Sequence, residues 1–156
     1  MTSSPAAFAP DEIRTGEPTR AARLKWVIVV DEALPSGRAV NASVCVAAAT
    51  AASVDGLLGP DATDADSLTH HGLPWAGCSI LAADREKLTR ILVAAHTKDE
   101  VHVAVMPEAA QSTRVYDDYL DAVAVLPTEE LIPLAVSIVG PRNRIDKLVK
   151  GLSLLP

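Results

Sequence analysis

Four short apolar runs along the chain are typical of strands buried in a sheet. They cover residues 25–31, 76–82, 101–106 and 134–139. The first run reads Trp-Val-Ile-Val-Val after Lys25, which predicts a strand covered on both faces. In the third run valine alternates with other residues, which is also typical of a strand. The pattern therefore predicts a sheet built from these four strands.

Two segments between these runs carry apolar residues at helical spacing. The spacing predicts a helix over about 40–54, with apolar positions at 40, 44, 47, 48 and 51. After the second strand, Asp84 is suited to cap a helix whose apolar face is Leu88, Ile91, Leu92 and Ala95. Because strands alternate with helices, we predict the α/β fold class, as a three-layer sandwich around a mixed sheet of about four strands.

The two ends of the pattern differ in character. Residues 1–22 mix proline, serine, alanine and charged residues without periodicity, which predicts a flexible or loosely docked N-terminal arm. Residues 23–156 are expected to form a single α/β domain, since this length suffices for one hydrophobic core. The stretch 60–74 is polar and rich in turn-forming residues, so we interpret it as a surface loop.

Composition and charge exclude several classes of protein. The formal net charge of −6 argues against nucleic acid as a partner, because general binding to phosphates relies on a basic face. The chain has no apolar run long enough to cross a bilayer, and no basic segment followed by an apolar block at its start. We therefore expect no membrane association, no secretory signal and a cytoplasmic protein.

Three polar residues mark the ends of predicted elements. Asp31 and Glu32 follow the first strand, at the edge where ligands bind to open α/β sheets. Asn41 stands at the expected start of the first helix, where asparagine is a favoured N-cap. Each of them therefore has two interpretations, as part of the wall of a binding cleft or as ordinary turn and cap chemistry.

The histidine pair His70-His71 and the two cysteines give little indication of chemistry. Metal sites need three or four convergent ligands, and adjacent histidines in an extended loop point apart, so we expect no metal. The chain carries none of the common nucleotide-binding or hydrolase motifs, and we expect no cofactor. Cys45 and Cys78 lie in apolar runs and are expected to be buried thiols.

The stretch 25–49 resembles the opening of the type II peptidyl-tRNA hydrolases. That family begins with a lysine, an apolar strand, a polar triplet, Leu, a Gly-Lys-Gly-Lys turn and a helix containing Gln-Cys-x-His. The matching residues of this chain are Lys25, Leu34, Gly37, Arg38 and Cys45. Further on, "VAVMPEAAQS" (103–112) stands where the family has a strand followed by Asp-Ala-Gly-Arg-Thr, and "LAVSIVGP" resembles its last strand.

The departures from that family fall on the residues that would carry its chemistry. The Asp of the triplet, the second turn lysine, and the helix Gln and His are replaced here by Ala33, Val40, Val44 and Ala47. The Asp-Ala-Gly-Arg-Thr loop has become Glu108-Ala-Ala-Gln-Ser112. The resemblance thus implies a degenerate hydrolase site that keeps Lys25, one carboxylate and one hydroxyl.

A closer resemblance is to a bacterial family called domain of unknown function 2000, which shares the hydrolase fold. It rests on "VVDEALPSGRAVNASVCVAA", "HGLPWAGCSILAADREKL", "AQSTRVYDDY" and "SIVGPRNRIDKLVKGLSLL". That family carries Asp-Glu, Leu-Pro-x-Gly and Asn in place of the hydrolase site. No settled activity comes with it, so the resemblance implies a fold and leaves the reaction open.

We predict a site in a cleft walled by polar residues. Its catalytic residues are Lys25, Glu108 and Ser112, and its ligand-binding residues are Asp31, Glu32 and Asn41. An ion pair between Lys25 and Glu108 is expected, because the resemblance places the loop after residue 106 near the first strand. Asn41 would add amide donors at a helix N-terminus for an anionic group. The alternative is that Lys25 reaches solvent and Asn41 only caps the helix.

Three functions stay open. The first is the binding or transformation of a small polar or anionic ligand. The others are ester hydrolysis on peptidyl-tRNA or aminoacyl-tRNA, and a non-catalytic interaction module, so whether the protein is an enzyme is undecided. The acidic charge and the missing histidine and lysine favour the first function over the second. The resemblance also implies a homodimer.

Overall fold

The protein is built around a mixed sheet in a computed structural model that describes residues 6–156. The strand order is β5-β6-β1-β4-β7, with β1 parallel to β4 and every other pair antiparallel. The strands are β1 (Leu24–Asp31), β4 (Ser79–Ala83), β5 (His102–Pro107), β6 (Pro133–Pro141) and β7 (Ser153–Leu154). The four predicted strands are confirmed. The fifth, β7, contains two residues, which is too short to leave a hydrophobic pattern.

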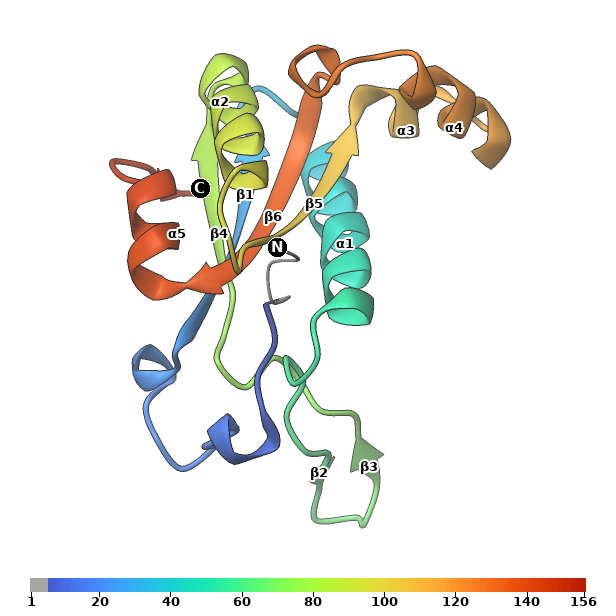
Figure 1. The fold of residues 1–156 in the computed structure, drawn as a ribbon. Helices are drawn as coiled ribbons and strands as arrows, with labels where there is room; N and C mark the ends of the chain where they lie inside the picture. Colours follow the sequence, from blue (N-terminus) through green and yellow to red (C-terminus); the bar gives the residue numbers. More distant parts are fainter. Residues whose placement is uncertain (1–5) are drawn as a thin grey trace.

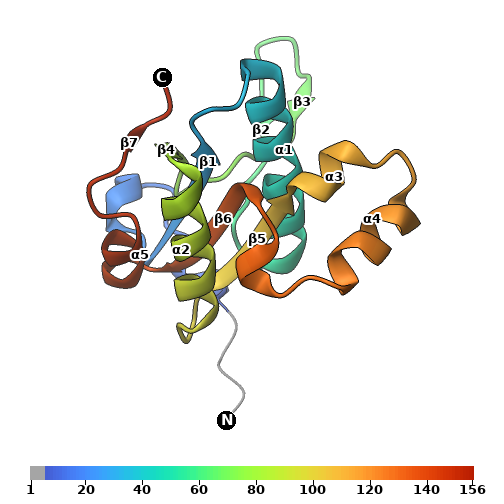
Figure 2. The ribbon, with the colours of Figure 1, turned by 90° about the horizontal axis from the view of Figure 1, so that it is seen from above.

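Helices cover both faces of the sheet, so the predicted three-layer α/β fold is confirmed (Figures 1 and 2). One face carries α1 (Ser36–Ser53), and the other carries α2 (Arg85–His96) and α5 (Arg142–Leu148). The short helices α3 (Glu108–Ser112) and α4 (Tyr116–Ala124) follow β5 and stand beside α1. The predicted surface loop contains a small hairpin of β2 (Ala62–Thr63) and β3 (Thr69–His70).

The two layers of core meet at β1, whose side chains alternate between them. Trp26, Ile28 and Val30 point to the α1 face, whereas Val27 and Val29 point to the α2 face. All five are at most 6% exposed, because helices cover the strand on both sides. This is the reason for the uninterrupted apolar run in the sequence.

Helix α2 is the element that the sequence predicts best. The Asp84 side chain accepts a hydrogen bond from the Lys87 backbone N–H at 2.8 Å, as expected of an N-cap. The predicted apolar face of Leu88, Ile91, Leu92 and Ala95 is buried throughout. Here the apolar side chains are large and lie on one stripe, so the pattern admits one orientation of the helix.

Helix α1 differs from its prediction in its start and in its buried face. It begins at Ser36 with Pro35 as N-cap, so Asn41 lies in the second turn and does not cap the helix. Its buried positions are Ala39, Ala42, Val46 and Thr50. The valines used to predict the face, Val40 and Val44, are 60% and 61% exposed. Small side chains toward the sheet let the helix approach it closely.

Residues 6–22 lie against the α1 face of the domain. Phe8 is buried, its ring centroid is 4.9 Å from that of Trp75, and its backbone N–H donates to the Asp55 carbonyl. Gly56 has a φ of 77°, and a Cβ there would lie 2.7 Å from the Cβ of Phe8, so the close approach requires glycine. The first five residues of the predicted arm lie outside the described residues, and flexibility of the arm stays a prediction.

Within residues 6–156, no helix is both long and apolar enough to cross a membrane.

Candidate functional site

Lys25 lies at the opposite end of the sheet from Glu108. Lys25 begins β1 and is paired in register with Gly140, whereas Glu108 follows Pro107, which is paired with Pro133. The partners of the two positions, Gly140 and Pro133, are seven residues apart along β6. At the rise of a strand, this corresponds to about 20 Å between Lys25 and Glu108. The Lys25 ammonium pairs with Asp146 of α5 at 2.6 Å. The predicted Lys25–Glu108 ion pair is wrong, because β1 and β5 run in the same direction and only their ends of like polarity meet.

Asp31 lies at the end of β1 on the α2 face, away from Asn41. Its Oδ1 accepts a hydrogen bond from the Ala33 backbone N–H at 2.9 Å, and its Oδ2 is 3.5 Å from Nη2 of Arg85. These are the contacts of a turn and of a helix start. Glu32 is exposed beside it, and its backbone N–H donates to the Ala83 carbonyl. A ligand-binding role for either residue stays a prediction.

Asn41 joins a polar cluster between α1 and α3. Gln111 links the two helices, because its Nε2 donates to Asn41 Oδ1 at 3.0 Å and to the Arg38 carbonyl at 3.1 Å. Its Oε1 accepts from Arg38 Nε at 2.6 Å. The cluster thus brings one predicted site residue, Asn41, to the segment 108–112 that was also predicted to form the site.

Glu108 and Ser112 lie on α3 together with Gln111. The Glu108 backbone N–H donates to the Ile132 carbonyl, which fixes the start of the helix. The Ser112 hydroxyl donates to the Ala109 carbonyl of its own turn at 3.3 Å. Both residues therefore lie on the same short helix as Gln111, and their catalytic roles stay predictions.

Two adjoining concavities lie between α1 and the α3–α4 segment. The first, which we call the polar groove, is open and has a volume of about 430 Å³. It is lined by Gly37, Arg38, Asn41, Ala110 and Gln111. The second, which we call the apolar cavity, has a volume of about 560 Å³ and lies along the next turns of α1. Ala110 of α3 lines both, so the two spaces are neighbours along α1.

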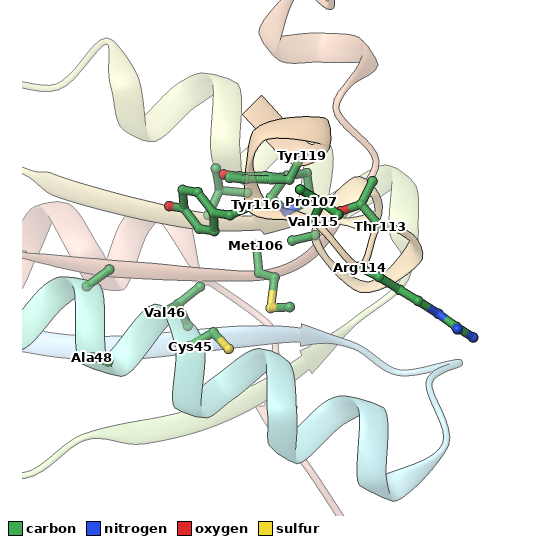
Figure 3. A pocket seen from close by; sticks show the side chains of 13 residues that line it. Cys45, Val46, Ala48, Met106, Pro107, Thr113, Arg114, Val115, Tyr116 and Tyr119 are labelled. Atoms are coloured by element: carbon green, nitrogen blue, oxygen red, sulfur yellow. The ribbon is translucent and has the colours of Figure 1, made fainter. Parts of the chain in front are cut away.

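Aliphatic and aromatic side chains line the apolar cavity (Figure 3). Cys45 and Val46 rise from α1, and the Met106 side chain points toward them from the end of β5. Tyr116 and Tyr119 of α4 close the other side, with their rings in edge contact at a centroid distance of 5.3 Å. The exposure of Cys45 corrects the expectation of a buried thiol, because α1 turns a different face to the sheet.

The polar groove presents hydrogen-bond donors rather than acceptors. The Gln111 carbonyl oxygen and the Asn41 Oδ1 are both used inside the cluster. Among residues 6–156, neither the Nη groups of Arg38 nor the Nδ2 of Asn41 donates to a protein group, and Arg38 has no carboxylate partner. Arg114, at the rim of the apolar cavity, likewise has none among these residues. Its side chain extends away from the apolar lining, on the side where α1 begins (Figure 3).

The two histidines and the second cysteine noted in the sequence do not come together in one site. His70 meets Asp64 at 2.9 Å and His71 meets Asp61 at 3.7 Å, so each histidine has one carboxylate neighbour. Within the described part of the chain, no group of three or more side chains is arranged to hold a metal ion. Cys78 is exposed as well, which corrects the expectation of a second buried thiol, although neighbouring groups desolvate its sulfur and raise the pKa of the thiol to about 12.

Sequence reasoning did not select Arg38 and Gln111, which hold the cluster together. Arg38 and Asn41 are three residues apart, which places them on one face of a helix only if the helix begins before residue 38. The predicted helix begins at about residue 40, although Pro35 is compatible with the residue before a helix. A helix predicted to begin at residue 36 would therefore have placed Arg38 on the same face as Asn41. Gln111 carries no comparable signal.

Comparisons with known proteins agree with this fold and leave the chemistry open. A model of the family described as "Protein of unknown function (DUF2000)" matches residues 24–156. A solved structure of a protein of unknown function from Agrobacterium tumefaciens strain C58 is similar, with a TM-score of 0.76 and 15% sequence identity. The likeness covers 85% of this chain and 97% of that one, and it concerns the fold alone. Among curated proteins, none matches the chain.

Proposed function

The chain belongs to the DUF2000 family over residues 24–156, and on that premise we propose that it binds a small anionic ligand in the polar groove. The proposal rests on one observation, that the groove contains hydrogen-bond donors that have no partner within the protein. Arg38 offers its Nη groups and Asn41 its Nδ2, while the cluster itself uses the neighbouring acceptors. An unpaired guanidinium beside an amide N–H is suited to a carboxylate or a phosphate.

The cluster also holds these donors in place before a ligand arrives. The Gln111 side chain accepts a hydrogen bond from Arg38 Nε and donates one to the Arg38 backbone carbonyl. These two contacts orient the guanidinium plane relative to α3. A preoriented side chain loses less conformational entropy on binding, which supports affinity for a small ligand. Glu108 and Ser112, on the same helix, are the side chains that we propose to act on a bound ligand if the protein is an enzyme.

Binding of inorganic phosphate and acetate, measured by titration calorimetry, tests the proposal. We expect Arg38→Ala to weaken binding at least tenfold, because a charge-assisted hydrogen bond contributes roughly 1.5–3 kcal/mol. Arg38→Lys should restore part of the affinity, since it keeps the charge and loses the planar fork. The matched control is Arg90→Ala, an exposed arginine on α2 that pairs with Glu86 on the opposite face of the sheet.

A second variant separates loss of the ligand from loss of the fold. Gln111→Glu changes one atom group and places a carboxylate 2.6 Å from Arg38 Nε in the present geometry. It should neutralise the cation, so phosphate and acetate should no longer bind. Because a carboxylate cannot replace the two hydrogen bonds that Gln111 Nε2 donates to Asn41 Oδ1 and the Arg38 carbonyl, thermal unfolding of the variant measures that separate cost to stability. Equal binding by the wild type, Arg38→Ala and Gln111→Glu would contradict the proposal.

An interaction module is the second candidate, and exposed apolar side chains favour it. Val40 and Val44 on α1, and Tyr116 and Leu120 on α4, all face solvent. Such a surface fits the expected homodimer, because exposed apolar patches mark contact sites. Sedimentation should then give a particle of twice the 16.4 kDa chain mass at micromolar concentration, and a monomer would contradict it. No feature of the groove favours ester hydrolysis on tRNA, which stays an alternative.

A further inference from the structure

We infer that the ligand of this site is amphipathic, with an anionic head in the polar groove and an aliphatic or aryl body in the apolar cavity. The inference rests on the proposed function and specifies its substrate class. It follows from the neighbouring positions of the two spaces along α1, from the lining of the cavity and from the position of the two unpaired arginines.

One face of α1 runs through both spaces and changes character along its length. Arg38, Asn41 and Cys45 follow one another at intervals of three and four residues, so they lie on one side of the helix. Arg38 and Asn41 line the polar groove, and Cys45, Ala48 and Ala49 line the apolar cavity. Ala110 of α3 borders both spaces from the other side. A ligand lying along α1 would therefore meet polar groups first and apolar groups after them.

The apolar cavity has the size and lining of a small-molecule site. Its volume of about 560 Å³ falls within the range of roughly 300–1,000 Å³ that is common for such sites. Met106 supplies an adaptable side chain at its base, and Tyr116 and Tyr119 supply aromatic faces at its side. Side chains of α1 at this level are small, which leaves the space between α1 and α4 unfilled.

The charges around the two spaces select an anion for the head of the ligand. Arg38 stands at the polar end, and Arg114 at the rim, and neither has a carboxylate partner among residues 6–156. Glu108 of α3, which is half-buried, and the exposed carboxylates of α4, Asp117, Asp118 and Asp121, are not among the residues that line either space. A medium-chain or aryl monocarboxylate satisfies both requirements, because its carboxylate fits the guanidinium and its body fits the cavity.

Cys45 provides a reporter inside the cavity. In a Cys78→Ser background it is the single thiol, because the chain contains two cysteines. We would follow its alkylation by iodoacetamide with mass spectrometry, in the presence of acetate, hexanoate, decanoate or decanol below their micellar range. Decanoate should slow alkylation at least tenfold when saturating. Acetate should leave the rate unchanged, since its methyl group does not reach the cavity.

Titration calorimetry on the same ligands tests whether the carboxylate and the hydrocarbon chain both contribute to the affinity. Affinity should rise about two- to fourfold for each added methylene, the upper figure being that of a fully buried methylene. Arg38→Ala should weaken every carboxylate by the same factor. Ala49→Phe, which fills the cavity from the side of α1, should abolish the gain with chain length and leave acetate binding intact. Thermal unfolding of each variant verifies that it is folded.

The possible results separate this inference from the proposed function. If acetate and decanoate bind equally, both depend on Arg38, and Cys45 is never protected, the amphipathic ligand is wrong and the anion site stands. If decanol protects Cys45 as well as decanoate and Arg38→Ala changes nothing, the head group has no role and both proposals fail. Failure of every carboxylate to bind would also overturn both.

Discussion

The two faces of the sheet are filled in different ways. The α2 face is closed by large aliphatic side chains of α2 and α5, and among residues 6–156 its buried polar residue is Asp31 at the end of β1. The α1 face contains a buried polar chain, in which Trp26 Nε1 donates to Ser137 Oγ at 2.8 Å and Ser137 contacts Thr50 Oγ1 at 2.7 Å. Since Thr50 donates to the Val46 carbonyl, Ser137 must donate to Thr50, and every member is satisfied.

The contrast explains why the candidate site lies on the α1 face. A helix with large apolar residues on one stripe buries that stripe, as α2 does, and its outer side is mainly polar, with Val93 partly exposed there. Helix α1 buries two alanines, one valine and one threonine, which leaves Val40, Val44 and Cys45 on its outer side. The outer side of α1 can therefore form one wall of a groove, whereas α2 lines neither of the two concavities.

The largest expected effect is on the closed face. Leu92→Ala should lower the free energy of unfolding by about 2–5 kcal/mol, because Leu92 is fully buried and its removal leaves a cavity. Val44→Ala on α1 should change it by less than about 0.5 kcal/mol, since Val44 is mostly exposed. Urea denaturation of both variants tests the difference. Similar losses for the two would contradict the assignment of the buried face of α1.

The polar chain of the α1 face should contribute less than a large apolar side chain. Ser137→Ala removes the acceptor of the Trp26 N–H and the donor to Thr50, so we expect a loss of about 1–3 kcal/mol in the free energy of unfolding. Ser53→Ala is the control, because Ser53 is exposed on α1 and its hydroxyl donates only to the Ala49 carbonyl. Equal stability of the two variants would show that the chain is energetically neutral.

Docking of the N-terminal segment on the α1 face should depend on pH. The Arg23 side chain and the Ala9 backbone N–H lower the pKa of Glu12 from its usual 4.5 to about 2. Because the folded pKa is the lower one, the stabilisation is complete above pH 4.5 and is lost as the pH falls toward 2. Glu12 is partly exposed, so screening reduces the contribution to about 1 kcal/mol.

Hydrogen exchange of residues 6–22 measures this effect. Exchange should accelerate as the pH is lowered through that window, beyond the intrinsic dependence of exchange on pH. Glu12→Gln should show faster exchange already at neutral pH, and Glu17→Gln, whose partner Arg14 is exposed, should match the wild type. An identical profile for Glu12→Gln and the wild type would contradict the role of Glu12.

The smallest effect is expected at Lys25, the residue that the resemblance singled out. Its ion pair with Asp146 lies near the surface, so Lys25→Ala should cost at most about 1 kcal/mol of stability. Because Lys25 lies at the far end of β1 and on the other face of the sheet from Asn41, the variant should bind acetate as the wild type does. Lost binding in this variant would restore Lys25 to the site.

The sequence by itself determined the four main strands, the three-layer fold and helix α2. Each of these leaves a strong local signal, because a strand covered on both faces must be apolar throughout, and a helix covered on one face must be apolar on one stripe. Asp84 adds a cap whose partner is three residues away, so its contact is local too. Family resemblance agrees with these signals, and the match over residues 24–156 confirms the family.

Only the tertiary structure decided which residues meet at the site. Asn41 and Gln111 are 70 residues apart, and no local pattern records that they face each other across α1 and α3. In α1 small and large apolar residues occur on several sides, so the hydrophobic pattern admits more than one buried face. Packing against the sheet selects the face of Ala39, Ala42, Val46 and Thr50. Strand direction separated Lys25 from Glu108, because a residue at the start of β1 cannot reach the end of β5.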